Sequence, residues 1–575
     1  MKQSMKKIFK TTLLLLGVAT AAGMFVSCSE DDLPAADALF RPILTEDNIE
    51  HGLTSDNIPY MIIRWDNYNT ADQYNVKVEA ADGSDSKAIS TDTTFYRFDN
   101  LQYDKEYNIS ISAANTKNGL QSKPFTLTTT SLDYPTSLGS VSATDLVDVA
   151  ARIRWSDAAY THLKVYHDSK DSLVSDITLT DEDKAARELI VGNLSPSTSY
   201  RVEAYANDSY RGKRRFTTTA AEKFGGNVID LRGLDETTAW KWFSVGSGSG
   251  YANTLDSLIK TQYQDQDLTI VLDGGVRYRI ATIELPATTG IITLTTGLTL
   301  AGNAQLCVEG NFRSAASSKV GGMTFSKIDF TDSEAKPRTQ DQHYGSTYIF
   351  NFNQSGGDMS IIKFFNCSIK YKRGICRIQT AATIDSVVID NCIIDSISGY
   401  GITNADNAKA AILNVKMTNT TVSNAEKTFV GSKPDADHQP NSLVVENCTF
   451  VYCIADAKPF FDFNSKNWTS FKDKFVFKNC LVGLAGRNKE ELATTGISGW
   501  SGSVQPECTD IYVTTDLLWQ PLSDEDPSPK AAFPSETLST TTVETFKSPM
   551  TSDFTITTSD LGGSSKPTPG DPRWY

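Results

Sequence analysis

The sequence has few of the residues that mark nucleic-acid binding or zinc binding. It contains 54 Lys and Arg against 69 Asp and Glu among 575 residues, which gives a formal net charge of −15 at pH 7. A chain with this balance has no global attraction for nucleic acid or for an anionic membrane, so an anionic ligand needs a local cluster of cations. There are only five histidines, and no Cys-x-x-Cys pair occurs. A zinc site is therefore not expected.

A short pattern returns five times in the stretch from residue 361 to residue 482. Each copy has an asparagine at its centre, an apolar residue two positions before it and another three positions after it. The central residues are Asn366, Asn391, Asn419, Asn447 and Asn479, so the pattern recurs every 25 to 32 residues. This period leaves room for two or three short strands, but it is too short for a helical hairpin of roughly 33 residues or more. Because the segments are rich in Val, Ile, Thr and Phe, the repeat predicts parallel β-coils.

Stacked coils make specific predictions about these positions. Each coil lies one strand spacing, ~4.8 Å, above the previous one, so equivalent residues form ladders. The residue after the asparagine and the one two further on, such as Cys392 and Ile394, share one face, and we expect that face to be the core. The asparagine itself tolerates left-handed backbone geometry and can bond its amide to the neighbouring coils, which suits a stacked corner.

This arrangement resembles the right-handed parallel β-helix of the pectin-lyase-like superfamily. It is more closely similar to a group of β-helix lipoproteins of Gram-negative glycan-utilisation systems. The resemblance covers about Gly226 to Tyr575 and is carried by the Asn-Cys coils, by Arg373-Gly374-Ile375-Cys376-Arg377 and by Gly570-Asp571-Pro572-Arg573-Trp574. Folds of this superfamily host lyases, hydrolases, adhesins and plain binding proteins, so the resemblance implies a fold but does not name an activity.

The chain before the β-helix contains one internal duplication. Trp65 and Trp155 lie in matching strand patterns, and Leu101 with Tyr107 matches Leu194 with Tyr200. A buried Trp on an early strand and a Leu-x5-Tyr corner resemble fibronectin type III domains. We therefore predict two such β-sandwiches, over residues 38–131 and 132–220. The resemblance implies spacers that hold a working domain away from the surface, and direct ligand binding is the alternative.

The N-terminus is typical of an export signal. Several lysines precede an apolar run from Thr11 to Val26, which is shorter than the ~20 residues that cross a bilayer. The run ends in Ser27-Cys28 and resembles the lipobox of bacterial lipoproteins, which implies a signal peptide over residues 1–27 and a lipid on Cys28. Cleavage without lipidation is the alternative. The acidic residues Glu30 to Asp32 resemble the signal that directs such lipoproteins to the outer face of the outer membrane, and an ordinary acidic tether over residues 28–37 is the simpler interpretation.

The β-helix domain is expected over residues 221–575, with a cap at its N-terminal end and a wrap at its C-terminal end. Apolar residues at helical spacing predict a helix from Thr254 to Tyr263, with Asn253 as its cap. After Val482 the repeat fades, which predicts an irregular wrap that runs down one side of the solenoid and ends at Trp574 and Tyr575. Residues 331–346 are predicted to be an insertion, and Lys327 takes the place of the corner asparagine. The first coils are predicted at Leu268–Leu272, Ile291–Leu294 and Leu298–Leu300.

Neither the cysteines nor the carboxylates indicate a bound metal. Eight cysteines remain after Cys28, and an even number in an exported chain suggests disulfides. However, cysteines at one position of successive coils point the same way and are poorly placed for the ~90° torsion of a disulfide, so buried thiols are favoured. Asp385, Asp390 and Asp395 are evenly spaced and could hold calcium, but this spacing along a strand sends successive side chains to opposite faces. We expect solvated turns there, no metal and no other cofactor.

The most distinctive local feature is a cluster of four cations in the eight residues from Lys370 to Arg377. Arg can hold the carboxylate of a uronic acid in bidentate fashion, and Tyr can stack on a sugar ring. If the coils are in register, the return strands Gly374–Ile378, Gly401–Asn404 and Pro459–Phe463 lie in this order along one wall, with the strand of Phe429 between the last two. Arg377 then lies within reach of Tyr400 and Asn404 of the next coil. The simpler interpretation is a solvated turn. The candidate ligand-binding residues are Lys370, Tyr371, Lys372, Arg373, Arg377, Tyr400 and Asn404.

These features predict an all-β lipoprotein that binds polysaccharide. It has two fibronectin type III-like sandwiches followed by a right-handed parallel β-helix, and it is anchored in the outer membrane facing the exterior. The expected ligand is an acidic polysaccharide, and other glycan-utilisation surface proteins are possible partners; nucleic acid is not. One alternative is a metal-independent lyase that cleaves by β-elimination, with Lys372, Arg373 and Arg377 as candidate catalytic residues. Another is an adhesin that binds protein. Glycoside hydrolysis needs two paired carboxylates, and no such pair is identifiable.

Overall fold

The computed structural model describes residues 39–156, 159–234, 236–243, 254–331, 347–463, 471–487, 492–498, 504–520 and 530–575. The predicted lipidation site Cys28, the helix cap Asn253 and nearly all of the predicted insertion lie outside these residues. Within the described part, nearly all regular elements are strands, as the all-β prediction requires. The chain divides into two compact units, Met1–Ser137 with Ala204–Lys213, and Leu138–Glu203 with Arg214–Tyr575.

The first β-sandwich packs two antiparallel sheets over an aromatic core. One sheet has the order β1-β2-β5, and the other has the order β4-β3-β6-β7 with β8 beside β6. Trp65 is buried, with its ring centroid 5.5 Å from that of Tyr74. The hydroxyl of Tyr107 accepts a hydrogen bond from the backbone N–H of Gln102 at 2.9 Å, which confirms the predicted tyrosine corner. The strands are β1 (Ile49–Leu53), β2 (Pro59–Arg64), β3 (Gln73–Ala80), β4 (Ser86–Thr91), β5 (Phe95–Phe98), β6 (Glu106–Asn115), β7 (Leu120–Gln121) and β8 (Phe125–Thr130).

The second β-sandwich repeats this design, as the duplication predicts. Trp155 is buried, and the hydroxyl of Tyr200 accepts a hydrogen bond from the backbone N–H of Ser195 at 2.8 Å. One sheet pairs β9 with β12, and the other has the order β11-β10-β13-β14. The strands are β9 (Ala151–Arg154), β10 (His162–His167), β11 (Ser172–Thr178), β12 (Glu188–Val191), β13 (Ser199–Ala206) and β14 (Ser209–Thr217).

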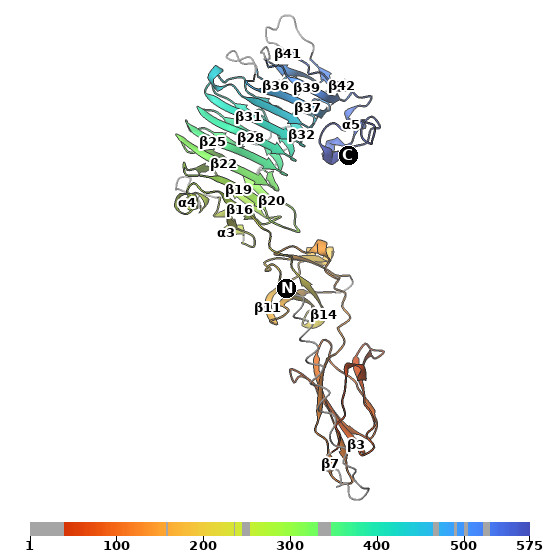
Figure 1. Cartoon of the computed structure of the whole chain (residues 1–575). Helices are drawn as coiled ribbons and strands as arrows, with labels where there is room; N and C mark the ends of the chain where they lie inside the picture. The colour runs from red at the N-terminus through yellow and green to blue at the C-terminus, as the bar shows by residue number, and fades with distance from the viewer. Residues whose placement is uncertain are drawn as a thin grey trace, which may run out of the picture. The chain divides into compact units, whose positions relative to one another are not determined.

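The rest of the chain winds into a parallel β-helix with three strands in each coil. Figure 1 shows β16, β19, β22, β25, β28 and β31 stacked in this order. These strands and their successors form the first column: β16 (Leu268–Leu272), β19 (Ile291–Thr296), β22 (Ser318–Ser326), β25 (Gly357–Phe365), β28 (Ala382–Asp390), β31 (Ala410–Thr418), β34 (Ser442–Glu446) and β37 (Lys474–Val482).

Two further columns complete each coil, and parallel pairing joins every strand to its equivalent in the next coil. The second column is β17 (Arg277–Ile280), β20 (Ala304–Val308), β23 (Ile328–Thr331), β26 (Ser368–Lys372), β29 (Ile393–Ile397), β32 (Thr421–Ala425) and β35 (Thr449–Val451). The third column is β18 (Ile283–Leu285), β21 (Phe312–Ser314), β24 (Tyr348–Phe352), β27 (Gly374–Ile378), β30 (Thr403–Ala405), β33 (Phe429–Val430), β36 (Pro459–Asp462) and β38 (Ala493–Ser498).

The asparagine corners have the predicted geometry. All five asparagines and Lys327 have positive φ, from 49° for Asn419 to 54° for Asn391 and Asn447. Their amides form a ladder, in which Asn479 Nδ2 donates to Asn447 Oδ1 at 2.8 Å and Asn447 Nδ2 donates to Asn419 Oδ1 at 3.2 Å. Asn419 Nδ2 then donates to a carboxylate oxygen of Asp390 at 2.9 Å. The stacked corners therefore satisfy polar groups that would otherwise face the next coil unbonded.

The core lies where the repeat predicts it. Cys392 and Ile394 are fully buried, and one continuous apolar cluster runs through the coils. The eight cysteines of the described chain are all free thiols; seven are buried and Cys508 is partly exposed, which confirms that they fill the core. Burial raises the pKa of the Cys376 thiol far above its ordinary value, so this side chain stays neutral and behaves as a small apolar group.

One predicted strand is wrong. Leu298–Leu300 forms a bend rather than a strand, because the chain turns away from β19 at Gly297. A side chain at Gly297 would lie 2.8 Å from Cδ of Arg232, so only glycine permits this close approach. The real second-column and third-column strands of these coils, β17, β18, β20 and β21, were not predicted from the sequence. They have three to five residues each, which is too short to show a clear alternating pattern.

Two segments outside the coils pack on the β-helix. Helix α4 (Thr254–Thr261) buries Leu255 and Ile259 against the first coils. After the last coils, α5 (Thr542–Thr545), β43 (Phe546–Ser548), β44 (Asp553–Ile556) and the turn η5 (Pro572–Trp574) form the C-terminal wrap, which lies against one side of the β-helix, as predicted. Phe546 and Phe554 of this wrap pack on Val451 and Leu481 of the coils. Trp574 Nε1 donates to Thr421 Oγ1 at 2.7 Å, which pins the end of the chain to the second column.

Candidate functional site

The third column forms a continuous wall, and two arginines of the predicted basic cluster, Arg373 and Arg377, lie at or on its strand β27. Strands β24, β27, β30, β33 and β36 are neighbours in this order, which confirms the predicted stacking of the return strands. Arg377 on β27 is in register with Asn351 on the preceding coil and with Asn404 on the following coil. Parallel in-register pairing therefore brings side chains together that are about 26 residues apart in the sequence.

Two arginines and two tyrosines form a stack on this wall. The guanidinium carbon of Arg377 lies 4.2 Å from the ring centroid of Tyr400 and 5.4 Å from that of Tyr348. The guanidinium carbon of Arg373 lies 4.7 Å and 5.7 Å from the same two centroids. The two rings meet edge to face, with centroids 5.4 Å apart. Each arginine is thus within the ~6 Å range of a cation–π contact with both tyrosines. This group is called the Arg–Tyr stack below.

Two glycines make the Arg–Tyr stack possible. A side chain at Gly374 would lie 2.9 Å from Cβ of Tyr400 and 3.2 Å from Cδ1 of Tyr348. Gly401 has φ of +71°, a left-handed conformation, and a side chain there would lie 2.5 Å from the carbonyl oxygen of Thr428. Glycine at these positions lets the rings approach and lets the chain turn directly after Tyr400.

Arg377 is held by a partly buried ion pair with Asp406. Its Nε and Nη2 donate to one carboxylate oxygen of Asp406 at 3.2 and 2.5 Å, and its Nη1 donates to the hydroxyl of Tyr348 at 3.1 Å. Lys433 binds the other oxygen of Asp406. Desolvation opposes ionisation of Asp406, but the bonds from Lys433 and Arg377 outweigh it and hold its pKa below the ordinary value. Arg377 therefore positions the tyrosines and has few donors left for a ligand.

Arg373 differs from Arg377 in its exposure and its partners. Its side chain is exposed, and it touches the rings of Tyr400 and Tyr348. Among the described residues, its guanidinium makes no hydrogen bond or ion pair with another side chain. An exposed guanidinium of this kind can hold a carboxylate in bidentate fashion, with one side of the Tyr400 ring beside it.

The structure places Lys372 inside the β-helix rather than on the wall. Its side chain is fully buried, and Nζ donates to the carbonyl oxygen of Thr331 at 2.6 Å. The cause is a left-handed residue within β26: Tyr371 has φ of 57°, and the equivalent residues of the next coils, Ser396 and Asn424, are also left-handed. This irregularity reverses the alternation, so Lys372 is in register with the buried Ile397. A buried side chain cannot contact a polymer, so Lys372 is not part of the binding surface.

The remaining predicted residues are divided between two walls. Lys370 and Tyr371 lie on β26 in the second column, where Lys370 is in register with Asp395. Asn404 lies on the third column but is mostly buried. Sequence reasoning missed Tyr348, Asp406 and Lys433, which complete the site. Tyr348 could have been found by stacking, since it is in register with Gly374, but Lys433 reaches Asp406 from a loop whose path the repeat does not predict.

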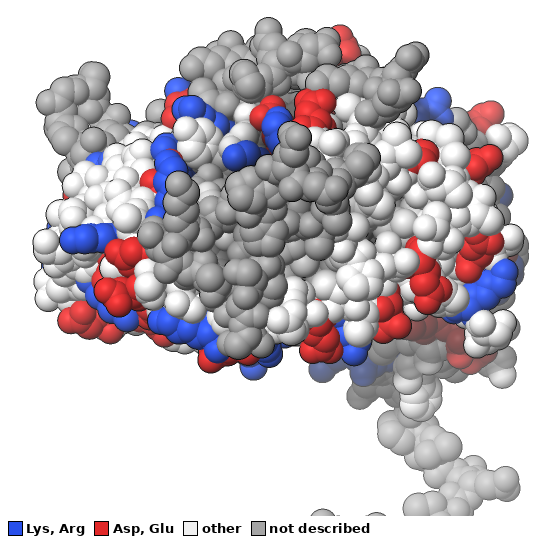
Figure 2. Space-filling view, turned by 90° about the horizontal axis from the view of Figure 1, so that it is seen from above, with Lys and Arg blue, Asp and Glu red and all other residues white. Residues whose placement is uncertain are grey.

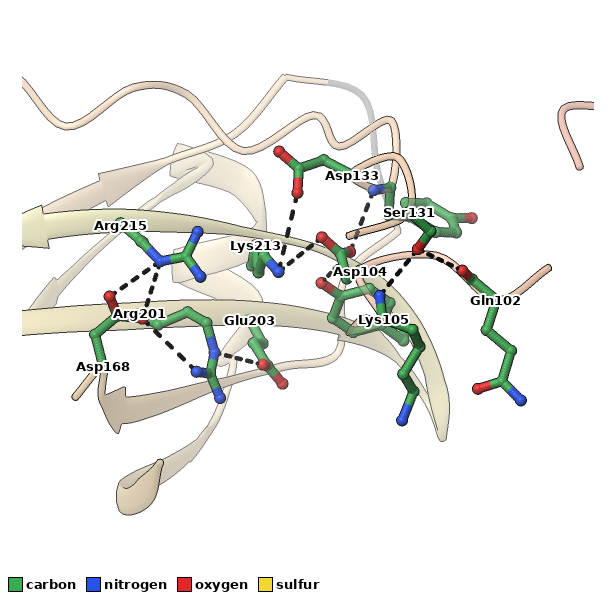
Figure 3. Close-up of polar contacts among 12 residues, drawn as sticks. Gln102, Asp104, Lys105, Ser131, Asp133, Asp168, Arg201, Glu203, Lys213 and Arg215 are labelled. Atoms are coloured by element: carbon green, nitrogen blue, oxygen red, sulfur yellow. Dashed lines mark hydrogen bonds and ion pairs between the residues drawn. The ribbon is translucent and has the colours of Figure 1, made fainter. Parts of the chain in front are cut away.

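Other clusters of charge in the molecule are neutralised by neighbouring groups. In the second sandwich, Arg215 and Arg201 pair with Asp168 at 2.9 and 3.7 Å, and Arg201 also pairs with Glu203 (Figure 3). Lys213 pairs with Asp104 at 2.8 Å (Figure 3). On the one face that Figure 2 shows, the acidic and basic side chains of the described residues are interspersed. Recognition of an acidic ligand on the described surface therefore depends on local groups such as Arg373.

A cavity of about 420 Å³ lies between the second sandwich and the first coils, within the second unit. Its lining includes Asp230, Asp273 and Arg232. Arg232 is bound to Asp148 at 2.9 Å and to Asp230 at 2.8 Å, so its charge is already compensated. The cavity is therefore poor in available cations and does not suit an acidic polymer.

The evenly spaced aspartates do not converge on one point. Asp385 pairs with Lys319 at 2.8 Å, Asp390 ends the asparagine ladder, and Asp395 accepts a hydrogen bond from Asn424 at 2.6 Å. In the described chain, no group of three or more His, Cys, Asp or Glu side chains could hold a metal ion. The described residues also contain no helix long and apolar enough to span a membrane.

Comparison with known proteins adds little about function. Residues 278–425 match a family described as "Domain of unknown function (DUF4957)", and this segment includes the Arg–Tyr stack and Asp406. No curated protein matches the chain. Among solved structures, a two fibronectin type-III domain segment from chicken tenascin is 15% identical and covers 32% of this chain and 100% of its own, with a TM-score of 0.17. The FN1-FN3 domains of chicken CNTN1 are 16% identical and cover 31% of this chain and 67% of their own, with a TM-score of 0.13.

Proposed function

We propose that this protein is a surface lipoprotein whose β-helix binds an acidic, uronate-containing polysaccharide as part of glycan capture. The observation that carries the proposal is the exposed guanidinium of Arg373, which lies 4.7 Å from the centroid of the Tyr400 ring and has no ion pair among the described residues. Both kinds of fold in the chain are compatible with carbohydrate binding or processing.

The chemistry of the Arg–Tyr stack supports this ligand class. A uronate presents a planar carboxylate beside a sugar ring with an apolar face. Arg373 can hold the carboxylate through two parallel N–H bonds, while Tyr400 offers an aromatic surface for the ring. Asp406 keeps Arg377 against the tyrosines, and therefore keeps the tyrosines in place before the ligand arrives. A rigid site of this kind loses little side-chain entropy on binding.

Binding is preferred to β-elimination because three residues considered as a base, Lys372, Arg377 and Tyr348, do not suit that role. Lys372 is buried, and Arg377 is occupied by Asp406. Desolvation is the main cause that raises the pKa of the Tyr348 phenol, although Arg377 and Arg373 act in the opposite direction. A proton acceptor needs a pKa near the working pH, so a raised phenol pKa disfavours this role. The lyase and the protein-binding adhesin are outcomes of the test below.

The anchor and the sandwiches complete the proposal. A lipid on Cys28 would hold the chain at the outer membrane, and two rigid β-sandwiches would separate the β-helix from the bilayer.

Changing Cys28 to Ala is expected to release the protein from the membrane fraction. Changing Glu30, Asp31 and Asp32 to Ala is expected to keep it lipidated but to protect it from protease added to intact cells. Equal digestion of this triple variant and the wild type would contradict surface export by the acidic residues.

The binding test uses the purified full chain and affinity gels of polygalacturonate, hyaluronan, alginate and a neutral glucan. We expect retention by at least one acidic polymer, and Arg373→Ala should weaken it by about 1.5 to 3 kcal/mol, the usual contribution of a charge-assisted bond. Arg279→Ala is the matched control, because Arg279 is a half-exposed arginine on the second column, bound to Glu309. Retention that Arg373→Ala leaves unchanged would contradict the proposal. Release of unsaturated uronates, seen as ultraviolet absorbance, would indicate a lyase instead.

A further inference from the structure

The cavity of about 420 Å³ in the second unit has the size of a small-molecule site. Such sites have volumes of ~300–1,000 Å³ and are common where two folded parts of a chain meet. Its apolar lining comes from Val149, Ile190 and Leu194 of the second sandwich and from the bend Leu298–Leu300, where a strand was predicted. The cavity therefore suits a small ligand rather than a long polymer.

Two hydrogen-bonded contacts hold the walls of this cavity together. Arg232 Nη1 and Nη2 donate to the carboxylate of Asp148 at 2.9 and 3.1 Å. Arg152 Nη2 donates to the carbonyl oxygen of Leu300 at 2.5 Å. Both contacts join residues of the sandwich to residues of the β-helix domain. The cavity is therefore formed before a ligand arrives, and binding orders few side chains.

Asp273 presents a carboxylate oxygen that is available to a ligand. Its backbone N–H donates to the hydroxyl of Tyr278 at 2.9 Å, and its Oδ2 accepts a hydrogen bond from the backbone N–H of Gly233 at 3.0 Å. Its Oδ1 has no hydrogen-bond or ion-pair partner among the described residues, and the side chain is partly exposed in the lining. Both oxygens of Asp230, in contrast, bind Arg232. Asp273 is thus fixed in place with one free acceptor.

The charge around the cavity is negative. The charged side chains of the lining are Asp230, Asp273 and Arg232, and Asp148 lies directly behind Arg232. This group has two negative charges in excess, and Arg232 is already bound to both of its neighbours. The other charged groups fastened to the walls compensate one another: Glu222 with Lys327, and Arg152 and Arg154 with Asp145 and Glu188. A walled site with this balance attracts a cation.

We propose that this cavity binds a small organic cation with a primary ammonium group. An ammonium has three N–H donors and no acceptor, so it can donate to Asp273 Oδ1. Its carbon skeleton can lie against Ile190 and Leu298, whose side chains remain 37% and 38% exposed. The described lining contains no aromatic ring, so the site lacks the faces that recognise a quaternary ammonium. An amino sugar and an aliphatic diamine share the required chemistry. The site is separate from the Arg–Tyr stack and does not rest on polysaccharide binding.

The test uses isothermal calorimetry of the full chain at about pH 6, where primary amines carry their proton. The probes are glucosamine and putrescine, each compared with a counterpart that has hydroxyl in place of ammonium, glucose and 1,4-butanediol. We expect at least one amine to bind about tenfold tighter than its counterpart, as a charge-assisted bond provides. Asp273→Asn keeps the shape of the side chain and should weaken amine binding about tenfold.

Asp267→Asn is the matched control, because Asp267 lies outside the lining and its Oδ1 accepts a backbone N–H, from Ile291 at 2.9 Å. It should leave amine binding unchanged. The probe that binds identifies the source of the ammonium, a sugar or a diamine. The inference is overturned if neither amine binds to the folded wild type, if the hydroxyl counterparts bind as tightly, or if Asp273→Asn binds amines like the wild type.

The two sites can be tested independently in the same protein. Arg373→Ala should leave amine binding unchanged, and Asp273→Asn should leave retention by acidic polymers unchanged. Loss of glycan retention together with normal amine binding would therefore count against the proposed function alone. Amine binding that falls in Arg373→Ala as much as in Asp273→Asn would contradict the cavity as the site.

Discussion

The chain contains two basic clusters of similar composition, and the structure gives them different roles. Strand β14 of the second sandwich carries Arg211, Lys213, Arg214 and Arg215, and the β-helix carries the cluster from Lys370 to Arg377. In the sandwich, Lys213 binds Asp104, Arg215 binds Asp168, and Arg214 donates to the carbonyl oxygen of Leu138 at 3.0 Å. In the β-helix, Arg373 has no such partner among the described residues. The comparison shows that a run of cations marks a site only where the fold leaves a cation without a carboxylate.

The largest effect is expected from the cation that the β-helix buries. Lys372→Ala should lower the free energy of unfolding by about 2 to 5 kcal/mol, because it leaves a cavity and removes the donor to the Thr331 carbonyl. Chemical denaturation followed by tryptophan fluorescence measures this change. Lys370→Ala, two residues away on a partly exposed side chain, is the control and should change stability by less than about 0.5 kcal/mol. A stable Lys372→Ala variant that loses ligand binding would place Lys372 in the site after all.

A basic residue of the sandwich should affect stability and not binding. Lys213→Ala removes a cation from the largely buried carboxylate of Asp104, which should cost about 1 to 3 kcal/mol of folding stability. Glycan retention by the folded variant should equal that of the wild type. If Lys213→Ala weakened retention as much as Arg373→Ala, the contrast between the two clusters would be lost.

The stabilisation that the ion pairs of Asp406 give to the Arg–Tyr stack should depend on pH through protonation of the Asp406 carboxylate. Its pKa in the folded protein is lower than its ordinary value of 3.8, so it binds fewer protons in the folded state than in the unfolded state. The stabilisation by its ion pairs is therefore complete above the ordinary value and is lost as the pH falls through the lower, folded value. We expect ligand binding to be constant from neutral pH down to about pH 5. The stability difference between the wild type and Asp406→Asn should shrink only below the ordinary pKa; a difference that shrinks at neutral pH would contradict this.

The smallest effects concern exposed positions and salt. Ser368→Ala, at a partly exposed position of β26, should change stability by less than about 0.5 kcal/mol.

Added salt should weaken glycan retention by the wild type, because exposed charges more than ~10 Å apart are largely screened at 0.1 M. In Arg373→Ala the remaining retention should depend less on salt. Equal salt dependence in both proteins would indicate that Arg373 does not carry the electrostatic part of binding.

Part of the candidate site could be predicted from the sequence. Arg373 and Arg377 were identified because they belong to a run of four cations, and Tyr400 because the period of the repeat places it 23 positions after Arg377 on the next coil. Lys372 was misplaced because the left-handed backbone at Tyr371 breaks the alternation of inward and outward side chains, and this irregularity has no clear sequence signal when the residue is not glycine. Tyr348, Asp406 and Lys433 were missed because they lie outside the basic run: Tyr348 is brought to it by the stacking of β24 on β27, and Asp406 and Lys433 reach it from turns.

The sequence by itself determined the architecture of this protein, because a repeat of fixed period can bury its apolar residues only by stacking. The Asn corners, the buried thiols, the tyrosine corners and the order of the return strands all follow from local patterns that recur. Only the tertiary structure decided which cations remain available. Whether Arg373, Arg377 or Lys372 meets a carboxylate, an aromatic ring or a buried carbonyl depends on residues far apart in the chain, such as Asp406 and Thr331. The sequence shows which residues are charged, but the fold decides which groups those residues contact.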